Sequence, residues 1–210
     1  ADFTVESLTK GINGFGTDMG GVVVGPKWAY DLLLMYRKDF GGALAAKTAW
    51  TIMVYGLPSL PIRFKHSMKT ALEVARYLEA DPRIAYVRYP GLESFPQATL
   101  ARKQMYDYDG NFAPGVLIFF SFKGKTPNTR REKGEKFINI LAKRAYSISL
   151  AVSLGMIRTL IEHPSSMTHA AIPAEEQIAK GMDPGGIRLS IGIEKPADII
   201  YDLKKALSQL

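Results

Sequence analysis

The sequence predicts an α/β fold. Short apolar runs rich in β-branched residues suit strands, and longer segments with apolar residues at helical spacing stand between them. The strongest strand signal is residues 115–122, GVLIFFSF, and residues 197–207 form an amphipathic helical pattern. A chain of 210 residues can bury one substantial core, or one core and part of another.

The segments before residue 82 are expected to be mainly helical. Residues 21–25, GVVVG, predict a buried strand, because a β-branched run stands between two glycines. A proline then suits a helix start, and residues 27–38 carry apolar side chains at helical spacing. Two further helices are expected: about 43–55, broken or kinked at the Gly-Leu-Pro of 56–58, and 61–81, which starts at a proline and connects two domains.

Strands and helices alternate after residue 82. The expected strands are residues 85–89, 115–122, 147–154 and 187–193, and the expected helices are residues 96–105, 134–144 and 197–207. Residues 123–136, KGKTPNTRREKGEK, mix bases and acids with proline, asparagine and glycine, which predicts a solvated loop.

The composition excludes several classes of function. A hydrophobic content of 47% with 22% charged residues is ordinary for a soluble globular protein, and no apolar run approaches the roughly 20 residues of a membrane span. The bases behind the net charge of +7 are scattered except at 123–136, where no aromatic residue is interleaved, so we expect no nucleic-acid partner, and we also expect no membrane partner. The lack of cysteine excludes disulfides and fits a reducing compartment, so we expect a cytoplasmic protein.

The most informative residue is Lys10, in the sequence Ser7-Leu8-Thr9-Lys10. Two hydroxyls and an amine next to five closely spaced glycines suit a phosphate-bearing aldehyde cofactor that is held on a lysine. Taken alone this motif is weak, because a lysine near a glycine-rich turn is more often a surface cation.

Further motifs make the pattern specific. They are residues 56–63 (GLPSLPIR), 89–92 (YPGL), 102–105 (RKQM), 154–155 (LG), 163–169 (HPSSMTH) and 187–194 (IRLSIGIE). In this order, and together with the Lys10 turn, they resemble the Cys/Met-metabolism family of pyridoxal-phosphate enzymes. That family includes methionine gamma-lyase, the cystathionine lyases and synthases, and the homoserine sulfhydrylases. The resemblance spans nearly the whole sequence and is interrupted chiefly at 123–136.

The resemblance implies roles for three residues of the first turn. Lys10 would form the Schiff base with pyridoxal 5'-phosphate and afterwards shuttle protons between substrate carbons. Ser7 and Thr9 would anchor the cofactor phosphate, because hydroxyls on a tight turn can point together at phosphate oxygens. The alternative for both hydroxyls is turn capping.

It also implies a substrate site near the C-terminal end of the sequence. Arg188 resembles the arginine that grips the substrate α-carboxylate, which a guanidinium can hold through two parallel hydrogen bonds. Ser153 would lend backbone contacts to the carboxylate, and Thr168 would steady the arginine. His163 and His169 suit packing or turns better than a metal site, because no carboxylate lies between them and the sequence has no cysteine, so no metal is expected.

The reaction is suggested by Val152. Members of the family that handle cystathionine commonly have an acid at this position, and an apolar residue favours a methionine-like substrate. The resemblance therefore implies γ-elimination that gives a thiol, ammonia and a 2-oxo acid. The alternatives are γ-replacement, of the O-acylhomoserine sulfhydrylase or cystathionine gamma-synthase type, and a non-catalytic subunit that retains the fold. Glu6, Phe15 and Arg158 depart from the family pattern.

The family fold implies two domains. Residues 1–65 would form the C-terminal end of the fold-type-I cofactor domain, and residues 66–210 the small C-terminal α/β domain with a mainly antiparallel sheet and covering helices. The resemblance also implies an aspartate a short distance before the lysine that pairs with the cofactor pyridine nitrogen, and the only acids before Lys10, Asp2 and Glu6, are too close to match it. We therefore expect a missing N-terminal half, or a chain carrying it, as a partner, and a homotetramer by resemblance.

Overall fold

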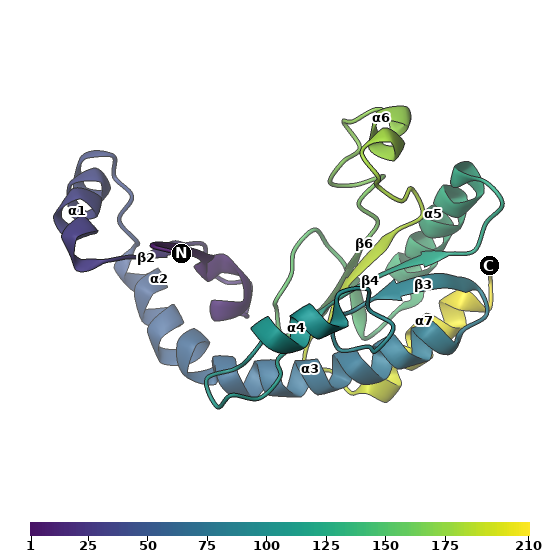
Figure 1. Ribbon diagram of the computed structural model, residues 1–210, viewed down its shortest axis with the longest axis horizontal. Coiled ribbons are helices and arrows are strands. Elements are labelled where there is room, and N and C mark those ends of the chain that lie inside the picture. Colours follow the sequence, from purple (N-terminus) through teal and green to yellow (C-terminus); the bar gives the residue numbers. More distant parts are fainter. The chain divides into compact units, whose positions relative to one another are not determined.

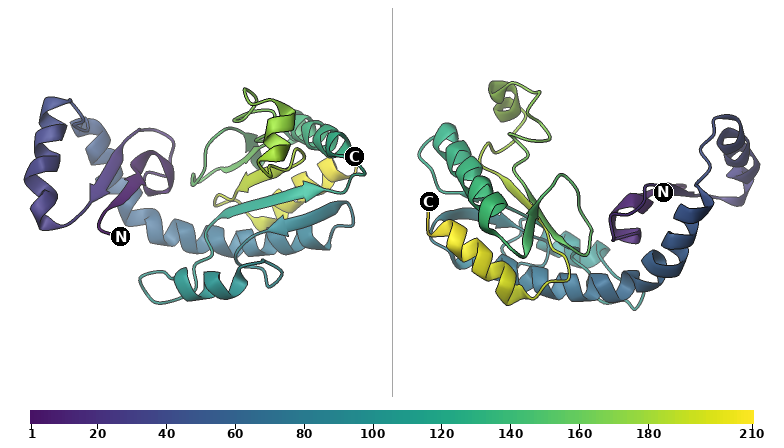
Figure 2. Two further views of the ribbon diagram at one scale, coloured as in Figure 1. Left: turned by 45° about the horizontal axis from the view of Figure 1, so that its top comes forward. Right: turned by 180° about the vertical axis from the view of Figure 1, so that it is seen from behind.

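The computed structural model describes residues 1–210, except for the side chain of Ala174, and divides the chain into two compact units. The first unit is Ala1–Pro61 and the second is Ile62–Leu210. Figure 1 and Figure 2 show the path of the chain within each unit. The expected boundary between residues 65 and 66 falls, like the boundary of the units, within helix α3 (Leu57–Ala80).

The first unit is built on a two-stranded antiparallel sheet. Strand β1 (Thr4–Ser7) pairs with β2 (Gly21–Val24), and the π-helical turn η1 (Leu8–Ile12) follows β1 directly. Strand β2 forms where the sequence predicts it, but most of its side chains are exposed rather than buried. The remaining helices are η2 (Lys27–Ala29), α1 (Tyr30–Asp39), α2 (Ala46–Thr51) and η3 (Ile52–Gly56).

The helix expected at about 43–55 is not broken at 56–58, although a wide π turn, η3, ends at Gly56, and the predicted helix start at Pro61 is wrong. Helix α2, the wide π turn η3 and α3 follow one another without a gap, and Pro61 lies inside α3. The hydroxyl of Ser59 donates to the carbonyl oxygens of Tyr55 at 2.5 Å and Gly56 at 3.2 Å. The Ser59 hydroxyl therefore adds a side-chain hydrogen bond to the backbone where η3 meets α3.

The second unit contains a five-stranded sheet in the order β3-β4-β7-β6-β5. Its strands are β3 (Ile84–Arg88), β4 (Leu117–Phe122), β5 (Ile148–Leu150), β6 (Thr159–Glu162) and β7 (Ile187–Ser190). All neighbouring strands are antiparallel except β5 and β6, which are parallel. The structure thus confirms a mainly antiparallel sheet. It shortens the strand expected at 147–154 and adds β6, which the sequence analysis does not predict.

Helices cover one face of this sheet, as Figure 2 shows for α5 and α7. The helices after α3 are α4 (Ala98–Gln104), α5 (Pro127–Arg144), α6 (Ala174–Ala179) and α7 (Pro196–Leu207). Leu78 of α3, Phe137 of α5 and Leu203 of α7 join Phe120 and Leu189 of the sheet in one buried core. Because side chains alternate along strands, the residues next to the core positions project from the opposite face of the sheet.

The solvated loop expected at 123–136 is wrong beyond Thr126, because α5 begins at Pro127. Thr126 and Thr129 form a capping box, in which each hydroxyl accepts a hydrogen bond from the backbone N–H of the other residue. Arg131 and Glu135 form an ion pair of 2.9 Å one turn apart on this helix. The mixed charges therefore belong to exposed and partly buried positions of a helix.

None of the helices in the described part of the chain combines the length and the apolar character that crossing a membrane would require.

Candidate active site

The Lys10 turn is held by the start of β2. The backbone N–H groups of Leu8 and Thr9 both donate to the carbonyl oxygen of Gly20, at 3.0 and 3.4 Å. Lys10 is half-buried and leaves the helical path of η1, with φ −86° and ψ −131°. The lysine is therefore presented by a backbone that two hydrogen bonds tie to the neighbouring strand.

A glycine lets this turn pack against the helix η3. A Cβ atom at Gly56 would lie 2.7 Å from the carbonyl oxygen of Ile12 and 3.0 Å from the Cα of Asn13. Asn13 is fully buried, and its amide donates to the hydroxyl of Thr17 and the carbonyl of Asp18, both at 3.3 Å. Residues on both sides of Lys10 are thus fixed within the first unit, and Gly56 is required for the close approach.

The two hydroxyls of the turn differ in their surroundings. Thr9 Oγ1 accepts from the backbone N–H of Gly20 at 3.0 Å and lies 3.3 Å from its carbonyl oxygen, so it supports the turn. Ser7 is exposed and has no capping hydrogen bond to η1. An exposed hydroxyl and a half-buried amine on one fixed turn fit a small ligand that carries a phosphate and a carbonyl.

Arg188 occupies the sheet face opposite the core. It lies opposite Phe119 of β4 and Glu162 of β6 in the register of β7. Its Nη2 atom is 3.0 Å from Glu162 Oε1 and donates to the carbonyl oxygen of Ser153 at 3.3 Å. The Glu162 side chain is 2% exposed and the Arg188 side chain 29%. Glu162 and Ser153 therefore fix the guanidinium on its buried side, while its other side is accessible to solvent.

The loop of residues 151–157, which carries Val152 and Ser153, is fixed along its length. The Ala151 N–H donates to the carbonyl of Ile161 at 3.2 Å, and the Gly155 N–H donates to Ser190 Oγ at 2.9 Å. At the end of the loop, the N–H of Ile193 donates to the carbonyl of residue 157 at 2.8 Å. Val152 is 51% exposed, so its apolar side chain is available to a ligand.

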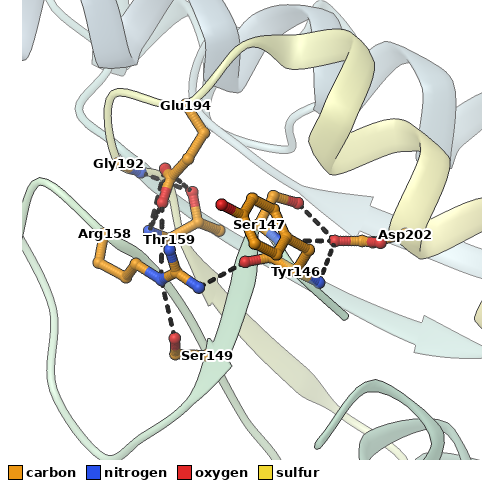
Figure 3. A network of polar contacts seen from close by, with 8 residues as sticks. All are labelled: Tyr146, Ser147, Ser149, Arg158, Thr159, Gly192, Glu194 and Asp202. Carbon is orange, nitrogen blue, oxygen red and sulfur yellow. Dashed lines mark hydrogen bonds and ion pairs between the residues drawn. The ribbon is translucent and has the colours of Figure 1, made fainter. Parts of the chain in front are cut away.

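A polar network, shown in Figure 3, closes the base of this loop. Glu194 accepts from the N–H of Thr159 at 3.0 Å and from its hydroxyl at 2.7 Å, and the same hydroxyl accepts from the Gly192 N–H at 2.9 Å. Arg158 donates to Ser149 Oγ at 2.9 Å and lies 4.0 Å from Glu194. Arg158 thus links β5 to the start of β6.

A second cluster anchors the approach to β7. Tyr86 donates to Asp183 Oδ2 at 2.8 Å, and Arg130 lies 3.4 Å from Asp183 Oδ1. Burial, followed by this hydrogen bond, raises the pKa of Tyr86 to about 12. Burial raises the pKa of Asp183, but hydrogen bonds, led by those from Tyr86 and the Gly185 N–H, and the charge of Arg130 together outweigh it, so the pKa is lowered overall. The segment before Arg188 is thus fixed from β3 and α5.

The segment 163–169 forms a compact turn. His163 is fully buried, with Nε2 2.7 Å from the carbonyl oxygen of Pro184 and Nδ1 2.7 Å from Ser166 Oγ. Burial lowers the pKa of His163, so the neutral ring donates from Nε2 and accepts at Nδ1. Thr168 is exposed and its hydroxyl is 3.0 Å from His169 Nδ1. In the described part of the chain Thr168 has no recorded contact with Arg188, and its role in the substrate site stays a prediction.

The structure therefore brings together Arg188 and Ser153 in the second unit, and Ser7, Thr9 and Lys10 in the first. It adds two residues that the sequence analysis does not select. Glu162 pairs with Arg188, and Ser190 holds the loop through Gly155. The signal for Glu162 is an acid at the end of a short apolar run, TLIE, but its partner is known only once the strand register is known.

A lysine amine beside an exposed hydroxyl, and a guanidinium held on a sheet face, suit an enzyme that uses a phosphate-bearing carbonyl cofactor on amino acids. The chain belongs to the Cys/Met metabolism PLP-dependent enzyme family, whose model matches residues 1–208. Members of this family depend on pyridoxal phosphate and are lyases and synthases. The expected α/β fold of the fold-type-I class and the expected cofactor are thus confirmed.

Individual relatives differ in the reaction they are named for. The chain is 40% identical to an L-methionine gamma-lyase of Porphyromonas gingivalis and 37% identical to a cystathionine beta-lyase of Coxiella burnetii. These matches cover 100% and 98% of this chain, but 49% and 50% of the relatives. A cystathionine gamma synthase of Xanthomonas oryzae pv. oryzae, solved in complex with aminoacrylate and cysteine, has a TM-score of 0.84 at 31% identity over 100% of this chain and 50% of its own. The chain thus spans about half the length of these relatives.

Proposed function

We propose that the chain is the C-terminal part of an enzyme that eliminates the γ-substituent of a methionine-like amino acid and yields a thiol, ammonia and a 2-oxo acid. The observation that carries the proposal is the Arg188 guanidinium, which contacts Glu162 and Ser153 on its buried side and is accessible to solvent on the other. It belongs to a chain of a PLP-dependent enzyme family. The similarity to an L-methionine gamma-lyase supports this reaction over the others.

In this proposal the first unit holds the cofactor. Lys10 would bind its carbonyl carbon, and Ser7 and Thr9 would contact its phosphate. When bound, pyridoxal phosphate supplies an electron sink that makes the bonds at the substrate Cα easier to break. Lys10 Nζ would then take the proton from the substrate Cα and move it between substrate carbons, which an amine does only in its neutral form.

Arg188 would bind the α-carboxylate of the substrate through two N–H groups, with Ser153 and Thr168 lining the same pocket. Two parallel hydrogen bonds fix the direction of the carboxylate as well as its place, so they orient the bonds at Cα. The exposed Val152 gives the far end of the substrate an apolar neighbour. This favours a thioether over a charged distal amino group, whose desolvation it would not compensate.

The test uses the complete enzyme that carries this chain, with L-methionine as substrate. We expect a visible absorbance band from the lysine-bound cofactor and release of a thiol. Lys10→Ala abolishes both, whereas Lys27→Ala, an exposed lysine of the same unit, retains both. Arg188→Lys keeps the band but raises KM by roughly tenfold or more, because the bidentate fork is lost. Full activity of Lys10→Ala contradicts the proposal and favours a non-catalytic subunit.

The second candidate reaction is γ-replacement, in which the γ-substituent leaves and an incoming sulfur nucleophile takes its place, so that no 2-oxo acid forms. The likeness to the Xanthomonas cystathionine gamma synthase favours it. The two reactions share the early proton transfers and differ in the access of water and of the incoming nucleophile. Comparing thiol release from methionine with homocysteine and acetate formation from O-acetylhomoserine and sulfide separates them: faster homocysteine formation favours replacement.

The first unit also suggests a partner. Trp28 is 74% exposed, Leu32 48% and Phe40 80%, and α1 has no buried residue. Exposed apolar surface of this kind marks an interface. We propose that it is covered by the N-terminal half of the same enzyme, or by a chain that carries it. The resemblance to the family adds a cytoplasmic homotetramer as the expected assembly.

A further inference from the structure

We propose that Glu162 is a positioning residue that fixes the Arg188 guanidinium for one approach direction of the substrate carboxylate. The inference rests on the proposed function, because it assumes that Arg188 binds the carboxylate. Its structural basis is the pair of adjacent strands β6 and β7, where the two residues lie opposite each other. Their antiparallel register places both side chains on the sheet face opposite the core.

The burial of the pair is strongly asymmetric. The Glu162 side chain is 2% exposed and that of Arg188 is 29% exposed, although their charged atoms are only 3.0 Å apart. The two opposite charges attract strongly in this position, because water screens a buried pair little. Moving Arg188 away from Glu162 therefore has a cost, which favours one position of the guanidinium.

The contacts of the guanidinium leave part of it available. Both recorded contacts, to Glu162 Oε1 and to the carbonyl of Ser153, are made by Nη2. Within the described residues, Nε and Nη1 of Arg188 have no recorded hydrogen bond. Since a guanidinium has five N–H donors in a planar fork, an incoming carboxylate can bind while both internal contacts persist.

The pairing also changes what recognises the substrate. Glu162 balances the charge of Arg188, so the pair attracts anions less than a lone arginine would. Recognition then depends on directed hydrogen bonds from a fixed fork, which suit a planar carboxylate of one orientation. Glu162 therefore lowers the general attraction of anions but fixes the fork, and we expect the fixed fork to make the larger contribution to the preference for a carboxylate over a group of similar size without one.

The experiment compares L-norleucine, which lacks the sulfur leaving group, with L-norleucinol, which also lacks the carboxylate. Binding of both is measured by calorimetry on the complete enzyme, and KM and kcat are measured for L-methionine. We expect the wild type to prefer norleucine, and Glu162→Ala to lose roughly tenfold or more of this preference. Glu162→Gln, which keeps one accepting oxygen, loses about threefold. KM for L-methionine rises more in Glu162→Ala than in Glu162→Gln, while kcat changes less in both.

Glu194→Gln is the matched control, because Glu194 is also a partly buried carboxylate at the sheet but bonds Thr159 rather than Arg188. It should keep the norleucine preference even where it lowers stability. If Glu162→Gln and Glu162→Ala both keep the wild-type preference for norleucine over norleucinol, the inference is overturned, whatever the reaction. If the wild type itself shows no such preference, both the inference and carboxylate binding by Arg188 are overturned. A preference that depends on Glu162 in an enzyme releasing no thiol supports the inference and contradicts only the proposed reaction.

Discussion

His163 shows how a single buried residue can make the fold sensitive to pH. Its ring is fully buried and both nitrogens have protein partners, Pro184 O and Ser166 Oγ. Burial lowers its pKa, even though the Pro184 carbonyl, Glu135 and Asp183 favour the charged form. The folded state therefore binds fewer protons at this residue than the unfolded state, whose histidine has a pKa of about 6.5.

We expect His163 to stabilise the fold in full above about pH 6.5 and to lose this contribution as the pH falls through its lowered folded-state pKa. Urea unfolding of the complete enzyme between about pH 5 and pH 8 measures the effect. His163→Gln should be less stable at neutral pH and should have a flatter pH dependence. His66→Gln, at an exposed histidine, should keep the wild-type pH dependence. If the free energy of unfolding depends equally steeply on pH in both variants, the pH dependence cannot be assigned to His163.

The residues of the candidate site could be predicted only in part. Lys10, Ser7, Thr9 and Arg188 are selected from motifs, which are local in the sequence. Glu162 cannot be selected in this way, because its role depends on a strand register between β6 and β7. Burial and partner choice are long-range properties that one short motif does not encode.

At the scale of the elements, the same limit applies to β6 and α5. Strand β6 is buried at all four positions, so it lacks the alternation that reveals a strand with one exposed face. Helix α5 begins in a charged stretch with proline and glycine, which suggests a loop until the Thr126 capping box is recognised. By contrast, β4 and α7 carry strong apolar patterns and form where the sequence predicts them.

The Thr159 hydroxyl is expected to hold the strands that flank the 151–157 loop. It donates to Glu194 and accepts from the Gly192 N–H, and Thr159 is fully buried. Thr159→Val keeps the shape but leaves these buried polar groups without their partner, so the free energy of unfolding should fall by about 1–3 kcal/mol. Urea unfolding of the complete enzyme measures this change.

Arg158→Ala provides the comparison within the same network. Its side chain is 47% exposed, so its pairing with Glu194 at 4.0 Å is screened by water. The variant should lower the free energy of unfolding by less than about 1 kcal/mol. A larger loss for Arg158→Ala than for Thr159→Val contradicts the view that the buried hydroxyl, rather than the exposed ion pair, holds this edge of the sheet.

At the scale of the whole molecule, the two units differ in how much apolar surface they bury. The second unit has a continuous core of side chains from α3, α5, α7 and the sheet. In the first unit, α1 buries none of its residues, and Val24, Trp28 and Phe40 are each more than half exposed. The first unit by itself leaves this apolar surface in water, which is unfavourable, so a further segment is expected to cover it.

This difference predicts how the 210-residue chain behaves by itself. Without a covering segment it should bind an apolar fluorescent dye and self-associate, and the complete enzyme should do neither, because the apolar surface of the first unit is then buried. Trp28→Ser and Phe40→Ser should each reduce dye binding by the isolated chain. Tyr146→Ser is the control, because Tyr146 is 87% exposed but belongs to the second unit. Equal reductions in all three variants, or dye binding by the complete enzyme at the level of the isolated chain, contradict the proposal that the first unit carries the covered interface.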